Sequence, residues 1–153
     1  MKVINNVEKD KKDLIKYRLK GIEPLPVVAG LVEKDGKYLL ARRLHGNVQV
    51  VGKWEFPGGK VEEGEEESAA IEREMREEFK LNTKALEFVT SVVHEYPTRV
   101  IYLKLWHCQV IDDNFDMDET DHDKFKWGTL EEIGNYELCP ADRELFDKIS
   151  AKN

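Results

Sequence analysis

Three glutamates in the middle of the chain are spaced so that their carboxylates can share one face of a helix. Glu74, Glu77 and Glu78 stand at positions i, i+3 and i+4, which an α-helix places within a sector of roughly 100°. Like charges at this spacing repel one another, whereas a hard cation such as Mg²⁺ takes oxygen ligands and is readily shared with phosphate. The pattern therefore indicates a metal site, although salt bridges along a solvated helix would explain part of it.

The residues around these glutamates predict a helix over 66–80 that is preceded by a glycine-containing loop. An apolar stripe is centred about 100° from the acidic face and consists of Ile71, Met75 and Phe79. Gly58 and Gly59 stand upstream, and a residue without a Cβ allows the backbone to come close to a cation. Loop and helix together are thus suited to phosphate chemistry that depends on a metal.

The whole segment resembles the signature of the Nudix hydrolase family, G-x5-E-x7-R-E-U-x-E-E-x-G-U, where U is apolar. Residues 59–81 match every fixed position but one, because Lys80 replaces the final glycine. That glycine normally ends the helix in a left-handed turn, where a lysine costs about 1 kcal/mol. We expect Asn82 to take over the turn. The resemblance extends over residues 25–150.

In that family a loop–helix–loop binds the metal ions. The ligands for Mg²⁺, or for Mn²⁺ in its place, that the resemblance implies are the carboxylates of Glu74, Glu77 and Glu78 and the backbone carbonyl of Gly58 or Gly59. It further implies that Glu65 pairs with Arg73 and so braces the loop against the helix.

The flanking segments resemble the MutT-like branch, which hydrolyses nucleoside triphosphates to the monophosphate and pyrophosphate. These segments are Leu40–Arg43 (LARR), Lys53–Lys60 (KWEFPGGK), His94–Pro97 (HEYP) and Pro140–Asp142 (PAD). The substrate-binding residues that they imply are Arg42, Arg43 and Lys60 for the phosphates, Phe56 and Tyr96 for stacking, and Asp142 for the base. A solvated strand edge would explain the two arginines equally well, and an aromatic residue on an apolar strand more often belongs to the core.

The implied reaction is an in-line attack of water on the β-phosphorus. The catalytic residues that the resemblance implies are Glu77, Glu74, Glu78 and Asp121. Asp121 stands in the acidic loop before the last strand, where the branch places a metal ligand or general base, and Glu119 is the alternative. A flexible acidic loop without a catalytic role would explain the same residues.

Asp142 directs our prediction of the base. An ionised aspartate can only accept hydrogen bonds, and the N4 amine of cytosine is a suitable donor. A buried aspartic acid that keeps its proton would also donate. We expect cytosine nucleotides, including C5-modified ones, among the best substrates, followed by 8-oxo-dGTP.

The sequence predicts strands mixed with two or three helices around these residues, which indicates an α+β fold. We expect residues 24–153 to form a Nudix-type α/β/α sandwich with a mixed β-sheet and a catalytic loop–helix–loop, after an N-terminal extension (1–23) with some helical character. The other predicted elements are a hairpin over 27–43 that turns at Asp35-Gly36, a loop at 44–54, strands near 86–94, 99–111 and 125–127, and a helix over 141–151.

The composition of the chain limits the kinds of molecule that it can bind. A formal net charge of −7 over 153 residues argues against nucleic-acid polymers, which need a basic surface, but a small nucleotide can bind through a metal. Cys108 and Cys139 suggest no disulfide framework and fit a reducing cytoplasm. No signal peptide is evident, and the apolar run at 27–32 is too short to span a membrane. We expect a monomer or homodimer.

Two other functions stay open at this point. A nucleotide-sensing Nudix module without catalysis is disfavoured because the signature carboxylates are all present. A hydrolase of ADP-ribose or another nucleoside diphosphate derivative is disfavoured only by the flanking segments, which is an argument from analogy.

Overall fold

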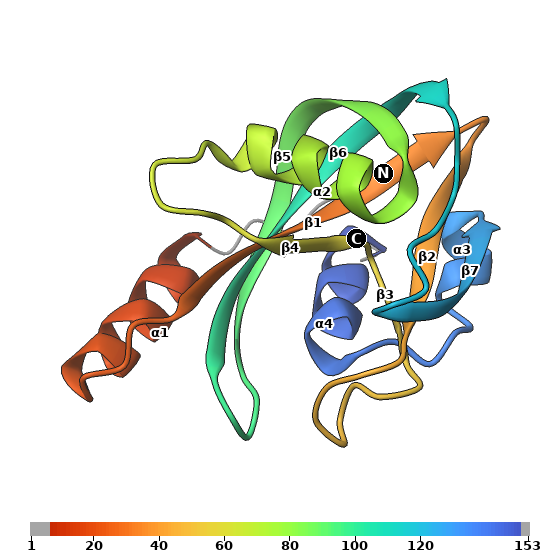
Figure 1. Ribbon diagram of the computed structural model, residues 1–153. Coiled ribbons are helices and arrows are strands. Elements are labelled where there is room, and N and C mark those ends of the chain that lie inside the picture. Colours follow the sequence, from red (N-terminus) through yellow and green to blue (C-terminus); the bar gives the residue numbers. More distant parts are fainter. Residues whose placement is uncertain (1–6, 151–153) are drawn as a thin grey trace.

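A mixed β-sheet lies between two helices in the computed structural model, which describes residues 7–150 (Figure 1). The sheet has seven strands in the order β3-β2-β1-β6-β5, with β4 paired to β1 and β7 paired to β2. Strand β1 (Leu25–Lys34) runs parallel to β6 (Val100–Asp113), and the other pairs are antiparallel. The predicted mixed sheet is confirmed.

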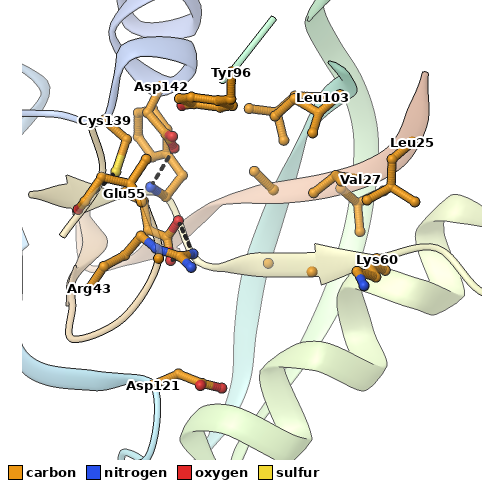
Figure 2. A pocket seen from close by; sticks show the side chains of 18 of the residues that line it. Leu25, Val27, Arg43, Glu55, Lys60, Tyr96, Leu103, Asp121, Cys139 and Asp142 are labelled. Atoms are coloured by element: carbon orange, nitrogen blue, oxygen red, sulfur yellow. Dashed lines mark hydrogen bonds and ion pairs between the residues drawn. The ribbon is translucent and has the colours of Figure 1, made fainter. Parts of the chain in front are cut away.

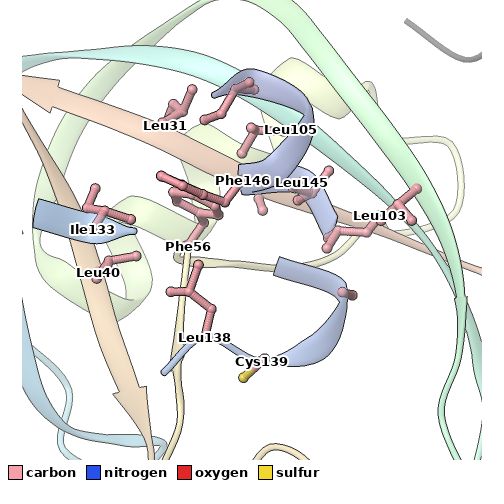
Figure 3. Packing of buried hydrophobic residues seen from close by; sticks show 14 of the residues in the cluster. Leu31, Leu40, Phe56, Leu103, Leu105, Ile133, Leu138, Cys139, Leu145 and Phe146 are labelled. Carbon is pink, nitrogen blue, oxygen red and sulfur yellow. The ribbon is translucent and has the colours of Figure 1, made fainter. Parts of the chain in front are cut away.

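Helices α2 (Glu67–Phe79) and α4 (Pro140–Ile149) cover opposite faces of this sheet. Successive residues of a strand point to opposite faces, and β1 follows this rule. Val28 and Val32 pack in the cluster under α2, whereas Ala29 and Leu31 pack in the cluster under α4 (Figure 3). The α+β class and the α/β/α sandwich are therefore confirmed.

The first hairpin turns where the sequence predicts. Strand β1 ends at Lys34 and β2 (Lys37–Arg43) begins three residues later. Asp35 and Gly36 have φ angles of 52° and 77°, and a two-residue hairpin of this kind needs positive φ at both central positions.

Helix α2 has the predicted apolar stripe but not the predicted end. Its three stripe residues are fully buried. Lys80 itself takes the left-handed conformation, with φ 55° and ψ 30°, and its N–H donates to the carbonyl of Arg76. Asn82 lies within β5 (Leu81–Glu95) opposite Asp112. The expectation that Asn82 takes over the turn is wrong, because the buried Leu81 begins the strand directly after Lys80.

The later strands extend beyond the predicted ranges, and three short elements were not predicted. β5, β6 and β7 (His122–Gly128) all extend beyond the predicted ranges, and α4 starts at Pro140. Three short elements were not predicted, namely β3 (Trp54–Glu55), β4 (Gly58–Lys60) and α3 (Leu130–Ile133). β3 and β4 arise from pairing with β2 and β1, which local sequence does not encode. The end of the predicted last helix, residue 151, lies outside the described residues.

Part of the N-terminal extension is helical. Helix α1 (Val7–Leu19) packs against β5, and the Tyr17 hydroxyl donates to Glu95 at 2.9 Å. Residues 1–6 lie outside the described part of the chain. No helix within residues 7–150 is long and apolar enough to cross a membrane.

Candidate active site

A cavity of about 360 Å³ joins the loop before α2 to the start of α4. Asp121 marks one end, and Asp142 with Tyr96 marks the other, with Arg43 and Glu55 between them (Figure 2). Glu78 lines the cavity at the α2 end, as do Gly58 and Gly59. We call Glu74, Glu77 and Glu78 the α2 carboxylates, and Glu55, Cys139 and Asp142 the Asp142 corner.

Arg73 connects the loop to the helix. Its Nε and Nη2 atoms donate to the Glu65 carboxylate at 2.7 and 3.0 Å, and Nη2 also donates to the Lys60 carbonyl. Its Nη1 atom donates to Glu74 at 3.0 Å and to Glu77 at 3.2 Å. The bonds from Arg73, followed by the backbone N–H of Glu62, lower the pKa of Glu65 to about 2. The pair that the sequence suggests between Glu65 and Arg73 is thus present.

Glu78 is left out of this arrangement. Its Oε2 atom is buried and has no hydrogen-bond partner within residues 7–150. Burial, followed by the nearby charge of Glu74, raises the pKa of Glu78 to about 9. The Glu77 side chain is 60% exposed and the Glu78 side chain 19%. Within residues 7–150 no lysine or arginine forms an ion pair with Glu78, whose Oε2 lies 4.0 Å from His122 Nδ1, and its position at the cavity would let a cation supply positive charge.

The backbone beside the α2 carboxylates also fits a cation. A Cβ at Gly59 would lie 2.5 Å from the carboxyl carbon of Glu74, and one at Gly58 would lie 1.9 Å from the Val28 carbonyl oxygen. Only glycine can bring the backbone so close. The carboxylates of α2 and the backbone carbonyl of Gly58 or Gly59 offer the hard oxygen donors that Mg²⁺ prefers.

The Asp142 corner is a second set of potential donors, because its three ligand atoms lie within 4.8 Å of one another. Burial, followed by the charge of Glu55, raises the pKa of Asp142 well above its usual range. Burial likewise raises the pKa of the Cys139 thiol strongly. Arg43 already supplies positive charge by donating to Glu55 at 3.2 Å. A thiol and a neutral acid are poor ligands for a hard cation, so the α2 carboxylates fit Mg²⁺ better.

Asp142 is fixed by backbone contacts. The Phe56 N–H donates to Asp142 Oδ1 at 2.9 Å, and the Asp142 residue is 5% exposed. Tyr96, whose hydroxyl accepts from the Ala141 N–H, lines the same end of the cavity.

The two other expected substrate residues differ in their relation to the cavity. Phe56 is among the residues that line it, although it is only 2% exposed and packs in the core with residues such as Leu138 and Phe146 (Figure 3). Arg42 is absent from the cavity lining and donates to Asp123 at 2.9 Å. Neighbouring residues of β2 point to opposite sides, which is why Arg43 reaches the cavity and Arg42 does not.

Lys60 and Asp121 also line the cavity, whereas Glu74, Glu77 and the alternative Glu119 are not among its lining residues. Asp121 is exposed on the loop before β7, and its charge acts on Glu78.

Three residues that line the cavity were not predicted from the sequence, namely Glu55, His122 and Cys139. His122 is 3% exposed, and its Nε2 lies 2.8 Å from Glu55 Oε2. Two signals could have pointed to them: Glu55 is the charged residue between Trp54 and Phe56, and His122 directly follows Asp121.

Comparison with known proteins identifies the family. A NUDIX domain model matches residues 27–148. The CTP pyrophosphohydrolase of Escherichia coli is 39% identical over 127 residues, which are 83% of this chain and 92% of that protein. The 8-oxo-dGTP diphosphatase of Escherichia coli is 28% identical over 85 residues, 56% of this chain and 66% of that protein.

A solved structure agrees with this result. The solution structure of the Escherichia coli ORF135 protein has a TM-score of 0.72 and 36% identity, and the match covers 86% of this chain and 92% of that one. With a family match over most of its length and the α2 carboxylates in place, the chain belongs to the Nudix hydrolase family.

Proposed function

We propose that this chain hydrolyses a nucleoside triphosphate to the monophosphate and pyrophosphate with the help of Mg²⁺, as a nucleotide-pool sanitising enzyme. One observation carries the proposal: a single cavity is lined both by Glu78, one of the α2 carboxylates, and by the buried Asp142 corner. A site for phosphates and a site for a base are what a nucleotide requires. The names of the two relatives, which concern CTP and 8-oxo-dGTP, support the substrate class.

At the phosphate end, Glu74, Glu77 and Glu78 would hold Mg²⁺, with Mn²⁺ as a substitute. A bound divalent ion neutralises polyphosphate charge and makes its water more acidic. Arg73 fixes two of these carboxylates by hydrogen bonds. Lys60 contributes positive charge at the cavity wall, and Asp121 is the carboxylate that can accept the proton of the attacking water.

At the base end, Asp142 is suited to cytosine. Its raised pKa favours the neutral acid, which has one acceptor oxygen and one donor hydroxyl. The acceptor fits the N4 amine of cytosine, and the hydroxyl can donate to N3. An ionised carboxylate would instead fit the two donors on the edge of guanine. We therefore rank cytosine nucleotides, including C5-modified ones, first and 8-oxo-dGTP second.

The proposal also covers where the domain begins and where it works. The family match begins at residue 27, which supports a hydrolase domain over 24–153 after an extension at 1–23. Cys108 and Cys139 are free and buried, which suits a cytoplasmic enzyme.

A substrate panel tests the proposal. Pyrophosphate release would be measured with dCTP, 5-methyl-dCTP, dGTP and 8-oxo-dGTP. Hydrolysis of ADP-ribose would be measured for comparison. Each substrate would be tested in Mg²⁺ and in excess chelator. We expect pyrophosphate from at least one triphosphate in Mg²⁺ and none in chelator. Full activity in chelator would refute the metal requirement, and a preference for ADP-ribose would favour the other substrate class.

Variants of Asp142 test how the base is read. Asp142→Asn should keep cytosine nucleotides ahead, because an amide offers the same pairing of one donor and one acceptor as the neutral acid. Asp142→Ala should weaken discrimination without abolishing pyrophosphate release. If the ratios among the four triphosphates are unchanged in both variants, Asp142 does not read the base.

A further inference from the structure

His122 lies between the two ends of the cavity and faces a carboxylate from each. Its Nε2 is 2.8 Å from Oε2 of Glu55, which belongs to the Asp142 corner. Its Nδ1 is 4.0 Å from Oε2 of Glu78, which belongs to the α2 carboxylates. The ring itself is buried and lies against Phe79, with 5.7 Å between the ring centroids.

The gap between His122 and Glu78 is unusual because both facing atoms lack partners. Within residues 7–150, His122 Nδ1 and Glu78 Oε2 are two of the three buried side-chain polar atoms without a hydrogen bond. A separation of 4.0 Å is too long for such a bond, but a movement of about 1 Å would form one once the neutral ring carries its proton on Nδ1 instead of Nε2. Buried polar atoms without partners are costly, so the structure favours any event that closes this gap.

Glu55 can cause such a movement because it contacts His122 and also belongs to the Asp142 corner. Its Oε2 atom accepts from His122 and, at 3.3 Å, from Arg43. The same carboxylate reaches within 4.8 Å of Asp142 and lines the cavity. An amino group of a base that donates to this corner must share the oxygens that now hold the His122 ring.

We propose that His122 is a positioning residue that transmits occupancy of the Asp142 corner to Glu78, so that the identity of the base affects kcat as well as KM. The proposal rests on the proposed function. A fitting base donates to Glu55 in place of His122 Nε2. The neutral ring can then carry its proton on Nδ1 and donate it to Glu78 Oε2, which fixes that carboxylate. A base that does not engage Glu55 leaves the gap open.

Three variants separate this role from a structural one. His122→Gln keeps a polar group near the position of Nε2 and removes the one at Nδ1, and His122→Asn does the reverse. The matched control is His107→Gln, because His107 Nε2 also lies 2.8 Å from a glutamate, Glu33, but neither residue lines the cavity.

The kinetic test compares the best and the worst triphosphate of the panel. In both His122 variants the ratio of the two kcat values should fall at least about fivefold relative to wild type, with a smaller change in the ratio of KM values. The His107→Gln control should keep both ratios. A His122 variant that lowers both kcat values equally would show a structural role only and would overturn the proposal, as would a wild type with equal kcat values.

A binding test avoids turnover. The Mg²⁺ affinity would be measured by calorimetry with saturating CMP and with saturating ribose 5-phosphate, which has the phosphate but no base. In wild type and His107→Gln, the two Mg²⁺ dissociation constants should differ at least about fivefold. In His122→Gln they should be equal. Equal constants in wild type, or a retained difference in His122→Gln, would overturn the proposal.

The outcomes distinguish this proposal from the proposed function. Failure of wild type to release pyrophosphate from any nucleotide contradicts the function. Release with base-dependent kcat values that the His122 variants retain contradicts only the coupling. If neither His122 variant folds, Glu55→Gln interrupts the same chain of contacts and should show the same losses, and retention of the wild-type ratios there would overturn the coupling.

Discussion

The two ends of the cavity both gather carboxylates, but in opposite ways. The α2 carboxylates come from one helix and include Glu78, which borders the cavity without a hydrogen-bond partner for Oε2 within residues 7–150. The Asp142 corner combines β3 with the start of α4, and Asp142 is almost completely buried there. Both acids have raised pKa values. The two acids differ in how their negative charge can be neutralised. A cation in the cavity can neutralise Glu78, whereas Asp142 is neutralised by a bound proton.

The largest effect should follow from removing the charge at the α2 end. Glu78→Gln should lower kcat at least about 100-fold, because it removes a proposed metal ligand. The free energy of unfolding should not fall, since a buried carboxylate without a partner is replaced by an amide. Steady-state kinetics and urea denaturation measure the two effects. Near-normal turnover would exclude Glu78 as a ligand.

Loss of the brace should have a smaller effect. Arg73→Lys cannot reproduce the contacts of a planar guanidinium with Glu65, Glu74 and Glu77, so kcat should fall by about 10- to 100-fold. The midpoint of urea denaturation should also fall, because loop and helix are no longer joined. Arg76→Lys, on the exposed side of the same helix, is the control and should leave both quantities nearly unchanged. A wild-type kcat in Arg73→Lys would contradict the positioning role.

The pH dependence of stability tests the other end. Below about pH 4 Asp142 is protonated in both the folded and the unfolded chain. Above that pH the unfolded chain ionises while the folded protein keeps its proton, so this residue lowers the free energy of unfolding as pH rises toward its folded pKa. Asp142→Asn removes this term. The stability of the variant relative to wild type should therefore increase between about pH 5 and about pH 8, measured as a series of urea denaturations. A constant difference would mean that the pKa of Asp142 is not raised.

The smallest effect concerns the end of α2, which should change stability without changing either site. Lys80→Gly should raise the free energy of unfolding by about 1 kcal/mol, because a left-handed φ is strained for lysine and free for glycine. Lys84→Gly on the exposed face of β5 is the matched control and should be destabilising. Destabilisation by Lys80→Gly would show that the lysine side chain contributes more than the strain costs.

The sequence predicts the α2 end better than the Asp142 corner for a physical reason. Spacing within one helix determines that Glu74, Glu77 and Glu78 share a face, and the resemblance suggests the partner of Glu65. Asp142 was identified from a short motif alone. Its neighbours Glu55 and Cys139 come together only through packing of β3 against the segment before α4, where Trp54 bridges to Leu138.

The errors have the same origin. Arg42 stands in the predicted motif, but strand alternation turns its side chain away from the cavity, whose lining does not include it. The end of α2 was wrongly shifted to Asn82, because the buried start of β5 outweighs the local preference of lysine. The contacts of His122 depend on β7, β3 and α2 at once, and no short-range pattern reports such an arrangement.

We propose above that the cation binds to the α2 carboxylates and that the base binds at the Asp142 corner. Calorimetric titration of Mg²⁺ into wild type, Glu78→Gln and Asp142→Asn, without any nucleotide, tests it most directly. We predict at least about a tenfold loss of Mg²⁺ affinity in Glu78→Gln and wild-type affinity in Asp142→Asn. Loss of affinity in Asp142→Asn with normal binding in Glu78→Gln would place the cation in the Asp142 corner and contradict the account.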